Sequence, residues 1–459
     1  MRWKAWGWVL LGALVAPLAA QDDDESVIEI EEAPEAEPRP KRDDAGGKFE
    51  PVPSRAADAE VELTAFVDGR KSFRLQRPVD WRLRESRSSE RESVYQIYVP
   101  GAKLPGRLRV TDRYQGMNPR SGPTTTRRSN AGKKGVTDFA IHARPIPHAT
   151  YTLTERDRTW RYVHAFVRAR GRTTELMLAT TSDVFDTAFR DFLASLTTFE
   201  SMRAEWPAVT KDYAVRSAGR LKVAVHKEVA TKTTSLFKTI KQAQRACDRA
   251  HGTLPRPPNG EKAPLVYVHA HRADEAGLVP RLGNVDTKCS ICFSGLALFV
   301  LLEEKEWTRE LASELSFRIG EFNAMYRWGD EVPQWVRTGE GAVTRAESMS
   351  GKKLPLLERV YWNWTTEPNL PTLAEMPALL RQEGSWDRYY KAAFCYVAFF
   401  RAGPRKSRKA YRSYLSDIEK NLDYEKAARE HLEPLGYEKI KSEMSTFLID
   451  GLKPFEKKE

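Results

Sequence analysis

Histidine is scarce in this chain: there are eight, and none lies between His271 and His431. Because imidazole is a principal zinc ligand, a zinc site built from that long stretch alone is not expected. Long apolar runs are missing too. Beyond the first twenty residues, no run reaches the roughly 18 apolar residues that a membrane-spanning helix needs.

Cysteine is limited to four residues, Cys247, Cys289, Cys292 and Cys395. Cys289 and Cys292 have the C-x-x-C spacing, but the chain has no second such pair, which excludes a zinc ribbon. In an exported protein, disulfides are favoured over metal thiolates. We therefore expect a disulfide between Cys289 and Cys292, or between one of them and Cys247, although four cysteines allow three pairings.

The chain has enough apolar residues for folded domains. Of its 459 residues 41% are hydrophobic and 10% aromatic, which indicates a globular protein of two or three domains. Residues 1–20 are typical of a secretory signal peptide, with Arg2 and Lys4 before an apolar segment at 8–18. That segment is too short for a comfortable membrane span. We expect a secreted or periplasmic protein with no membrane span after signal cleavage.

Residues 21–60 form an acidic segment with fourteen acidic residues, five basic residues and several prolines. Such a composition buries too little apolar surface to fold alone, so we expect a disordered linker. Once its charge of −9 and the +2 of the signal are taken from the total of +11, residues 61–459 carry +18. A net charge of this sign makes an anionic polymer a candidate partner.

Residues 61–203 are predicted to form one α+β domain. A helix is predicted over 184–196, where phenylalanines recur at helical spacing. Residues 113–135, rich in Gly, Pro, Ser, Thr and Arg, are expected to be a mobile basic loop. Alternating residues predict the strands of an antiparallel sheet at 72–78, 94–99, 108–110, 151–154, 162–167 and 174–179.

Two short motifs carry a resemblance for this domain. Pro78–Trp81 (PVDW) ends the first predicted strand in a turn, and Phe192–Leu196 (FLASL) ends the helix before a further strand. Similar segments open and close the PsbP-like fold, which residues 61–203 resemble. The resemblance implies binding or scaffolding rather than catalysis. The histidines of this region, His142, His148 and His164, are scattered, and we expect them to be surface or core residues.

Residues 204–459 differ in pattern from the first domain. A long helix is predicted over 233–251, and the Lys-rich tail, 407–459, has helical periodicity. Buried strands are predicted at 221–226, 264–270 and 296–302. We expect a small mixed sheet followed by a mainly helical subdomain.

The stretch 307–343 is the most informative in the chain. Its periodicity predicts a helix, a turn containing Gly329 and Pro333, and a second helix. On the first helix, Glu310 and Glu321 are expected to belong to a solvated acidic face.

A broken motif lies on this helix pair. The window Ser-Glu-Leu-Ser-Phe contains Ser313, Glu314 and Phe317, and Glu340 follows Trp335 on the second helix. The order resembles the gluzincin-type zinc metallopeptidases, which carry His-Glu-x-x-His on one helix and a glutamate zinc ligand on the next. In that resemblance Ser313 and Phe317 stand at the histidine positions, Glu314 at the general-base position, and Glu340, shifted by two residues, at the third-ligand position.

Phenylalanine cannot coordinate a metal and a neutral serine hydroxyl is a poor zinc ligand, so only Glu340 is competent among the three ligand positions. We therefore expect no metal and no cofactor. The resemblance implies a peptidase fold that has lost its zinc, and thus a non-catalytic exported protein. It would bind peptide or protein in the cell envelope along the strand at 296–302, since relatives place that strand at the edge of the cleft.

Two other functions stay open. One is an active metallopeptidase or other hydrolase with an atypical zinc ligand set, such as Glu314 and Glu340 with His269. His269 and His271 alternate on one predicted strand and point the same way. The other is a basic envelope protein that binds polyanions, which the charge of +18 on residues 61–459 would favour.

Overall fold

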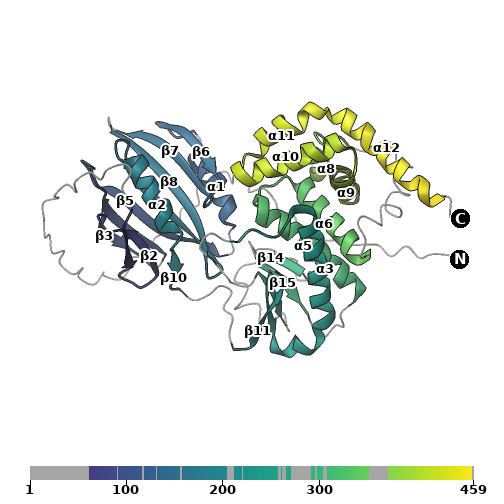
Figure 1. Ribbon diagram of the computed structural model, residues 1–459, viewed down its shortest axis with the longest axis horizontal. Coiled ribbons are helices and arrows are strands. Elements are labelled where there is room, and N and C mark those ends of the chain that lie inside the picture. The colour runs from purple at the N-terminus through teal and green to yellow at the C-terminus, as the bar shows by residue number, and fades with distance from the viewer. Residues whose placement is uncertain are drawn as a thin grey trace, which may run out of the picture.

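The computed structural model describes residues 61–456, except 90, 116–117, 131, 156–157, 204–210, 220, 257–259, 261–264, 270–290, 295–296, 303–307 and 351–370. The expected signal peptide and acidic linker lie outside this range. Figure 1 shows two bodies side by side, antiparallel sheets from the N-terminal half and a mixed sheet with helices from the rest. The predicted α+β class is confirmed. None of the helices in the described part combines the length and apolar character of a membrane span.

The N-terminal body contains two antiparallel sheets. The smaller has the order β1-β2-β10, with β1 at Leu63–Val67, β2 at Phe73–Pro78 and β10 at Glu200–Ser201. The larger has the order β3-β4-β5-β9-β8-β7-β6. Its strands are β3 Arg82–Ser88, β4 Glu92–Tyr98, β5 Gly106–Gln115, β6 Val136–His142, β7 His148–Glu155, β8 Arg158–Ala169 and β9 Arg172–Thr181.

The core of this body lies between the sheets and helix α2 (Phe185–Leu196). On β8, Val163, Ala165 and Val167 alternate with residues of the opposite face and enter the core beside Phe192. A strand with period two buries one face in this way because successive side chains point to opposite sides of the sheet. The strands and the helix predicted for residues 61–203 are confirmed.

The predicted mobile loop at 113–135 is wrong. It contains a 3₁₀ turn at Pro119–Ser121 and helix α1 (Gly122–Asn130). Asn118 caps the turn by accepting a hydrogen bond from a backbone N–H at 3.0 Å. A Cβ on the first residue of α1 would overlap the ring of Phe166, so the helix begins in direct contact with β8. Packing against the sheet orders a segment whose composition favours a loop.

The second body begins with a mixed sheet of order β11-β12-β13-β15-β14. Strands β12, β13 and β15 are parallel, and β11 and β14 are antiparallel to their neighbours. Helices α3 (Thr234–His251) and α5 (Arg309–Trp328) share one apolar core with this sheet. The strands are β11 Tyr213–Ala218, β12 Leu221–His226, β13 Val266–His269, β14 Ile291–Ser294 and β15 Ala297–Leu301.

The edge of this sheet is not the predicted one. The strand at 296–302 corresponds to β15, which lies inside the sheet between β13 and β14. Strand β14 is the edge within the described part of the chain, and it pairs antiparallel with β15. The prediction failed because the four residues of β14 are too few for an alternation pattern to be recognised.

The remaining helices form the upper part of this body in Figure 1. Helix α9 lies at their centre, and its residues from Ala392 to Phe400 are all buried. The helices are α6 Gln334–Ser350, α8 Met376–Arg381, α9 Trp386–Ala402, α10 Arg405–Asn421, α11 Tyr424–His431 and α12 Tyr437–Glu456. The predicted helical subdomain is confirmed.

Helices α5 and α6 meet at two glycines. A Cβ on Gly320 would lie 2.7 Å from the Cα of Gly341 and 2.8 Å from the carbonyl oxygen of Glu340. Any side chain at Gly320 would force the backbones apart, because the contact is with main chain that cannot rotate away. The helix–turn–helix predicted over 307–343 is therefore a tightly packed pair.

Asn118 joins the two bodies. Its Nδ2 donates to the carbonyl oxygen of Met325 at 2.8 Å and to Oδ1 of Asp330 at 3.1 Å. The backbone N–H of Asp330 in turn donates to Oγ of Ser121 at 3.0 Å. The 3₁₀ turn and the C-terminal end of α5 thus exchange hydrogen bonds in both directions.

Glu419 and Lys420 of α10 form a second set of contacts between the bodies. Arg144 pairs with Glu419 at 2.8 Å, and Arg120 donates to the Glu419 carbonyl oxygen. The backbone N–H of Ala143 donates to the Lys420 carbonyl oxygen at 3.1 Å. Burial lowers the pKa of Arg120 to about 10, and the nearby Glu419 and Tyr424 partly oppose this shift.

We predict that Asn118→Ala lowers the free energy of unfolding by about 2 kcal/mol, because it removes buried hydrogen bonds, one of them to a carboxylate. Urea denaturation of the full chain would measure the change. Asn130→Ala is the matched control, since its side chain bonds only to its own body, donating to Thr126 O at 2.8 Å and accepting from Lys133 Nζ at 3.0 Å. An equal loss in both variants would contradict a role for Asn118 in joining the bodies.

Candidate functional site

The three residues at the positions of the His-Glu-x-x-His motif, Ser313, Glu314 and Phe317, lie on the N-terminal half of α5. Thr308 caps this helix, its hydroxyl accepting from the N–H of Leu311 at 3.2 Å. Ser313 and Glu314 are half-buried, and Phe317 is buried. The structure thus places the three residues on one helix, as predicted.

Phe317 packs into the junction of α5 and α6. A Cβ on Gly341 would lie only 2.8 Å from Cε2 of Phe317, so the phenyl ring lies against the backbone of α6. Its ring centroid is 5.6 Å from that of Tyr390 on α9. Phe317 belongs to the same apolar core as Trp335. Hydrocarbon therefore fills the place at which the gluzincin resemblance puts a zinc-binding imidazole.

The Glu340 carboxylate has a complete set of protein partners. Its Oε2 lies 2.8 Å from Nε2 of His251 on α3 and 3.7 Å from Nη1 of Arg401 on α9. Its Oε1 accepts a hydrogen bond of 2.9 Å from the hydroxyl of Tyr411 on α10. Ser313 and Phe317 are not among these partners, so the structure does not bring the three expected ligand positions together around one point.

The electrostatics of Glu340 follow from this arrangement. Its side chain is only 3% exposed, and burial alone would raise its pKa. The charges of His251 and Arg401, with the hydrogen bonds from His251 and Tyr411, outweigh burial and lower the pKa from 4.5 to about 2. The carboxylate is ionised across the physiological pH range. The pKa of Tyr411 rises, because the phenol is buried and faces this anion.

The other carboxylates of α5 form a separate ionic group. Arg318 donates to Glu321 at 2.9 Å and lies 3.7 Å from Glu314, and Arg337 of α6 lies 3.8 Å from Glu321. Glu321 is 3% exposed, so its expected place on a solvated face is wrong, whereas Glu310 is exposed. Burial raises the pKa of Glu314, opposed by Arg318. Sequence spacing could not show that Arg337 reaches across from α6.

The structure gives Cys247 as a buried free thiol, and Cys395 is also buried. Cys247 Sγ lies 3.4 Å from the hydroxyl of Thr344, and burial raises the pKa of its thiol to about 12. Pairing of Cys247, one of the two expected alternatives, is absent from this structure. Cys289 lies outside the described residues, as do the side chains of Cys292 and His269, so the other alternative and the ligand set with His269 stay predictions.

His164 takes part in a buried polar group on β8. Its Nδ1 lies 2.5 Å from Glu175, and its Nε2 lies 3.2 Å from the hydroxyl of Tyr151. Arg109 and Arg113 also pair with Glu175. Burial would raise the pKa of Glu175, but His164 and the two arginines lower it. His164 is buried and both of its ring nitrogens contact polar partners, which identifies it as a core histidine, in agreement with the prediction.

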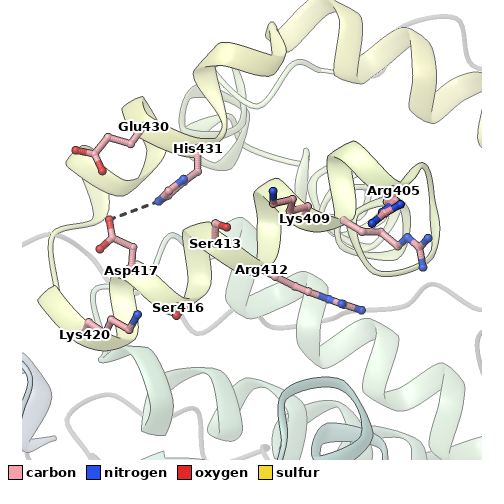
Figure 2. A pocket seen from close by; sticks show the side chains of 10 residues that line it. Arg405, Lys409, Arg412, Ser413, Ser416, Asp417, Lys420, Glu430 and His431 are labelled. Atoms are coloured by element: carbon pink, nitrogen blue, oxygen red, sulfur yellow. Dashed lines mark ion pairs between the residues drawn. The ribbon is translucent and has the colours of Figure 1, made fainter.

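Two cavities are lined by basic residues of α10. The smaller, of about 350 Å³, is lined by partners of Glu340, namely His251, Arg401 and Tyr411, and by Arg408 and Arg412. The larger, of about 730 Å³, lies along the outer side of α10 and reaches α11 (Figure 2). Its lining is Arg405, Arg408, Lys409, Arg412, Ser413, Ser416, Asp417, Lys420, Glu430 and His431. The sequence indicated a Lys-rich tail, but it did not show that basic side chains gather on one face of α10.

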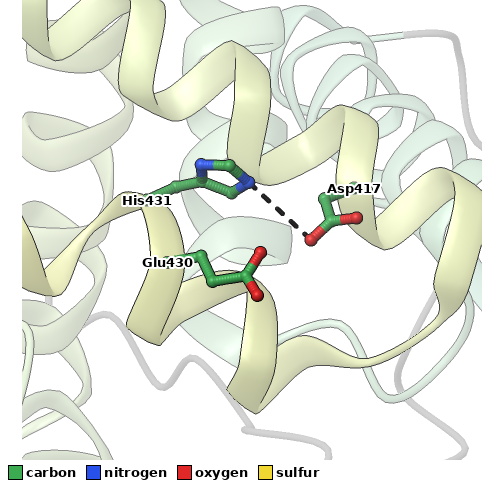
Figure 3. A group of neighbouring side chains, drawn as sticks. All are labelled: Asp417, Glu430 and His431. Carbon is green, nitrogen blue, oxygen red and sulfur yellow. Dashed lines mark ion pairs between the residues drawn. The ribbon is translucent and has the colours of Figure 1, made fainter.

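Asp417, Glu430 and His431 could hold a metal ion at one end of the larger cavity (Figure 3). One ligand atom from each lies within 4.8 Å of the others, and His431 Nε2 lies 3.7 Å from Asp417 Oδ2. Two carboxylate oxygens and one imidazole suit several divalent cations. Within the described residues, this is the group of three His, Cys, Asp or Glu side chains close enough to share a metal ion. The turn between α10 and α11 brings the three residues together, so no local sequence motif predicts the group.

No protein family model and no curated protein matches the chain. The similar solved structures include CyanoP, the PsbP protein of Synechocystis sp. PCC 6803, at 14% identity and TM-score 0.22 over 33% of this chain and 98% of that one. A mutant of protein Mog1 matches at 7% identity and TM-score 0.24, over 31% of this chain and 96% of that one. A crystal structure from Bacteroides thetaiotaomicron VPI-5482 matches at 10% identity and TM-score 0.21, over 58% and 78%.

A PsbP protein is thus among the matches, at low coverage of this chain. TM-scores of this size carry no inference about function. The gluzincin resemblance stays an expectation from the sequence.

We predict that Glu340→Gln lowers the free energy of unfolding by about 3 kcal/mol at pH 7, since it leaves a buried cationic group without its counter-charge. Because folding lowers the pKa of Glu340, its stabilisation is present above the unfolded-state value near 4.5 and is lost as the pH falls towards 2. The difference in the free energy of unfolding between Glu340→Gln and the wild type should therefore become smaller as the pH is lowered. Urea denaturation of both proteins at neutral and at acidic pH measures this difference.

The control for this variant is Glu310→Gln, an exposed change of the same kind on α5. It should shift stability by no more than about 0.5 kcal/mol. A wild-type-like Glu340→Gln protein would show that the carboxylate is not a structural ion.

Proposed function

We propose that this protein is a non-catalytic, exported, peptidase-like protein that binds an extended peptide segment by strand addition. The observation that carries the proposal is the position of β14, an edge strand of the mixed sheet that also contacts α5. An edge strand presents backbone donors and acceptors that an incoming peptide can pair with. The gluzincin resemblance expects the substrate-pairing strand beside the helix that carries the broken motif.

The backbone of β14 has a defined outward-facing residue. The N–H of Leu298 donates to Leu265 O at 2.9 Å, towards β13. Leu298 is paired with Phe293 on β14. In an antiparallel pair the residues opposite each other either both bond across the pair or both face away from it. The N–H and C=O of Phe293 therefore point away from β15, to the side where a peptide would pair.

The non-catalytic part of the proposal is supported by the residues at the motif positions. Phe317 packs on Gly341 and Tyr390, and the Glu340 carboxylate is bound by His251 and other protein groups. A hydrolase that used Glu340 as a ligand would have to break a buried ion pair first, at a cost of about 3 to 5 kcal/mol. The geometry therefore favours binding over an atypical metallopeptidase.

We predict that the wild-type chain binds members of an array of immobilised 12-residue peptides, and that Phe293→Pro abolishes this binding. Proline removes the outward N–H on which pairing depends. Phe293→Leu is the matched control, because it keeps the N–H while it also changes the side chain. Circular dichroism of both variants would verify that the fold is kept.

Failure of the wild type to bind any peptide of the array would overturn the proposal, as would equal binding by Phe293→Pro and Phe293→Leu. Peptide cleavage that a chelator stops and that Glu314→Gln abolishes would replace it with the hydrolase alternative.

A further inference from the structure

One face of α10 is a cationic stripe. Arg405, Lys409, Arg412 and Lys420 recur at spacings of three, four and eight residues, which brings them to one side of the helix (Figure 2). The opposite side carries the buried residues Ser407, Tyr411, Tyr414, Leu415 and Ile418. The stripe therefore faces outward from a helix whose other side is fixed in the core.

The cations of this stripe lack counter-charges within the described part of the chain. Arg405, Lys409, Arg412 and Lys420 form no ion pair with any residue that the structure describes. Buried arginines nearby differ in this respect, since Arg401 pairs with Glu340. The stripe therefore presents positive charge at the surface of the helical subdomain.

The arrangement is unfavourable for the helix itself. Arg405 and Lys409 are like charges at i and i+4, as are Arg408 and Arg412, and each such pair destabilises a helix by about 0.2 to 0.5 kcal/mol. A bound anion would turn this repulsion into attraction. The larger cavity of about 730 Å³, between α10 and α11, is a concave surface where such an anion could bind.

The cationic surface is longer than one small ligand. At 1.5 Å per residue, the helix positions from Arg405 to Lys420 span about 22 Å. Arg408 and Arg412 line both cavities, and the smaller one also contains Arg249 and Arg401, which pair with Glu347 and Glu340. Charge repeated over this distance suits a linear polymer with regularly spaced anionic groups better than a single anion.

The lining chemistry favours a glycan over single-stranded nucleic acid. Proteins that bind single strands stack bases on aromatic rings. Among the ten residues that line the larger cavity, all within the described part of the chain, the imidazole of His431 is the single aromatic ring. The hydroxyls of Ser413 and Ser416 add neutral hydrogen-bonding groups between the cations, which suits sugar hydroxyls as well as sulfate or carboxylate groups.

We propose that the α10 face binds a linear anionic polysaccharide, sulfated or carboxylated, with Arg405, Lys409 and Arg412 as the main charged contacts. The site is separate from β14 and does not depend on peptide binding. The acidic residues Asp417 and Glu430 bound the cationic stripe at its α11 end and limit where the polymer can lie.

The test is the affinity of the full chain for a fluorescent heparin oligosaccharide at graded NaCl concentrations. We expect wild-type binding that weakens steeply with salt, as ion release requires. Replacing Arg405, Lys409 and Arg412 together by Glu should reduce the affinity about 100-fold or more, because three charge contacts are lost and reversed. Heparin should protect the chain from thermal unfolding, and the variant should lose this protection.

The matched control replaces Arg381, Lys406 and Arg429 by Glu. These residues are exposed, carry the same total charge and do not line either cavity. The control should keep its affinity within about threefold of the wild type. An equal loss of heparin affinity in the two triple variants would show that net charge alone controls binding, and would overturn the proposed site. So would the absence of heparin binding, or stronger binding to an oligothymidylate of equal charge.

The peptide array separates the two proposals. The α10 triple variant should bind peptides as the wild type does, and Phe293→Pro should bind heparin as the wild type does. Loss of both activities in either variant would contradict the independence of the two sites.

Discussion

A single buried carboxylate connects much of the second body. Glu340 extends from α6 and contacts His251 of α3, Arg401 of α9 and Tyr411 of α10. An ion in this environment is tolerated only when its partners replace the lost hydration. The three partner helices must therefore keep their positions for the anion to remain buried, and the packing of the helical core depends on that constraint.

The same region is stabilised by contacts of its own side chains. At positions where the resemblance expects zinc ligands, the chain has a phenylalanine that packs on α6 and a glutamate neutralised by neighbouring helices. The close contact of Gly320 with Gly341 leaves the two helices in direct backbone contact. Packing and an internal ion network thus supply the cohesion of this helix pair.

Much of the fold could be predicted from the sequence, because its strands alternate and its long helices have a clear apolar periodicity. The failures have physical causes. Helix α1 is ordered by its contact with Phe166, which no local pattern reveals. Strand β14 is too short to show a period. For the site, the sequence indicated that Glu340 is important, but its partner His251 lies 89 residues away, and only the packing of α3 on α6 brings them together.

The buried thiol of Cys247 lies at the junction of α3 and α6, and its reactivity depends on that junction. Its thiol contacts Thr344 of α6, is fully enclosed and has its pKa raised to about 12. An alkylating reagent must reach the sulfur and needs it in the thiolate form. The packed α3–α6 pair prevents both. The rate at which this sulfur is modified therefore reports how often α3 and α6 separate, so the protein carries an intrinsic probe of its own opening.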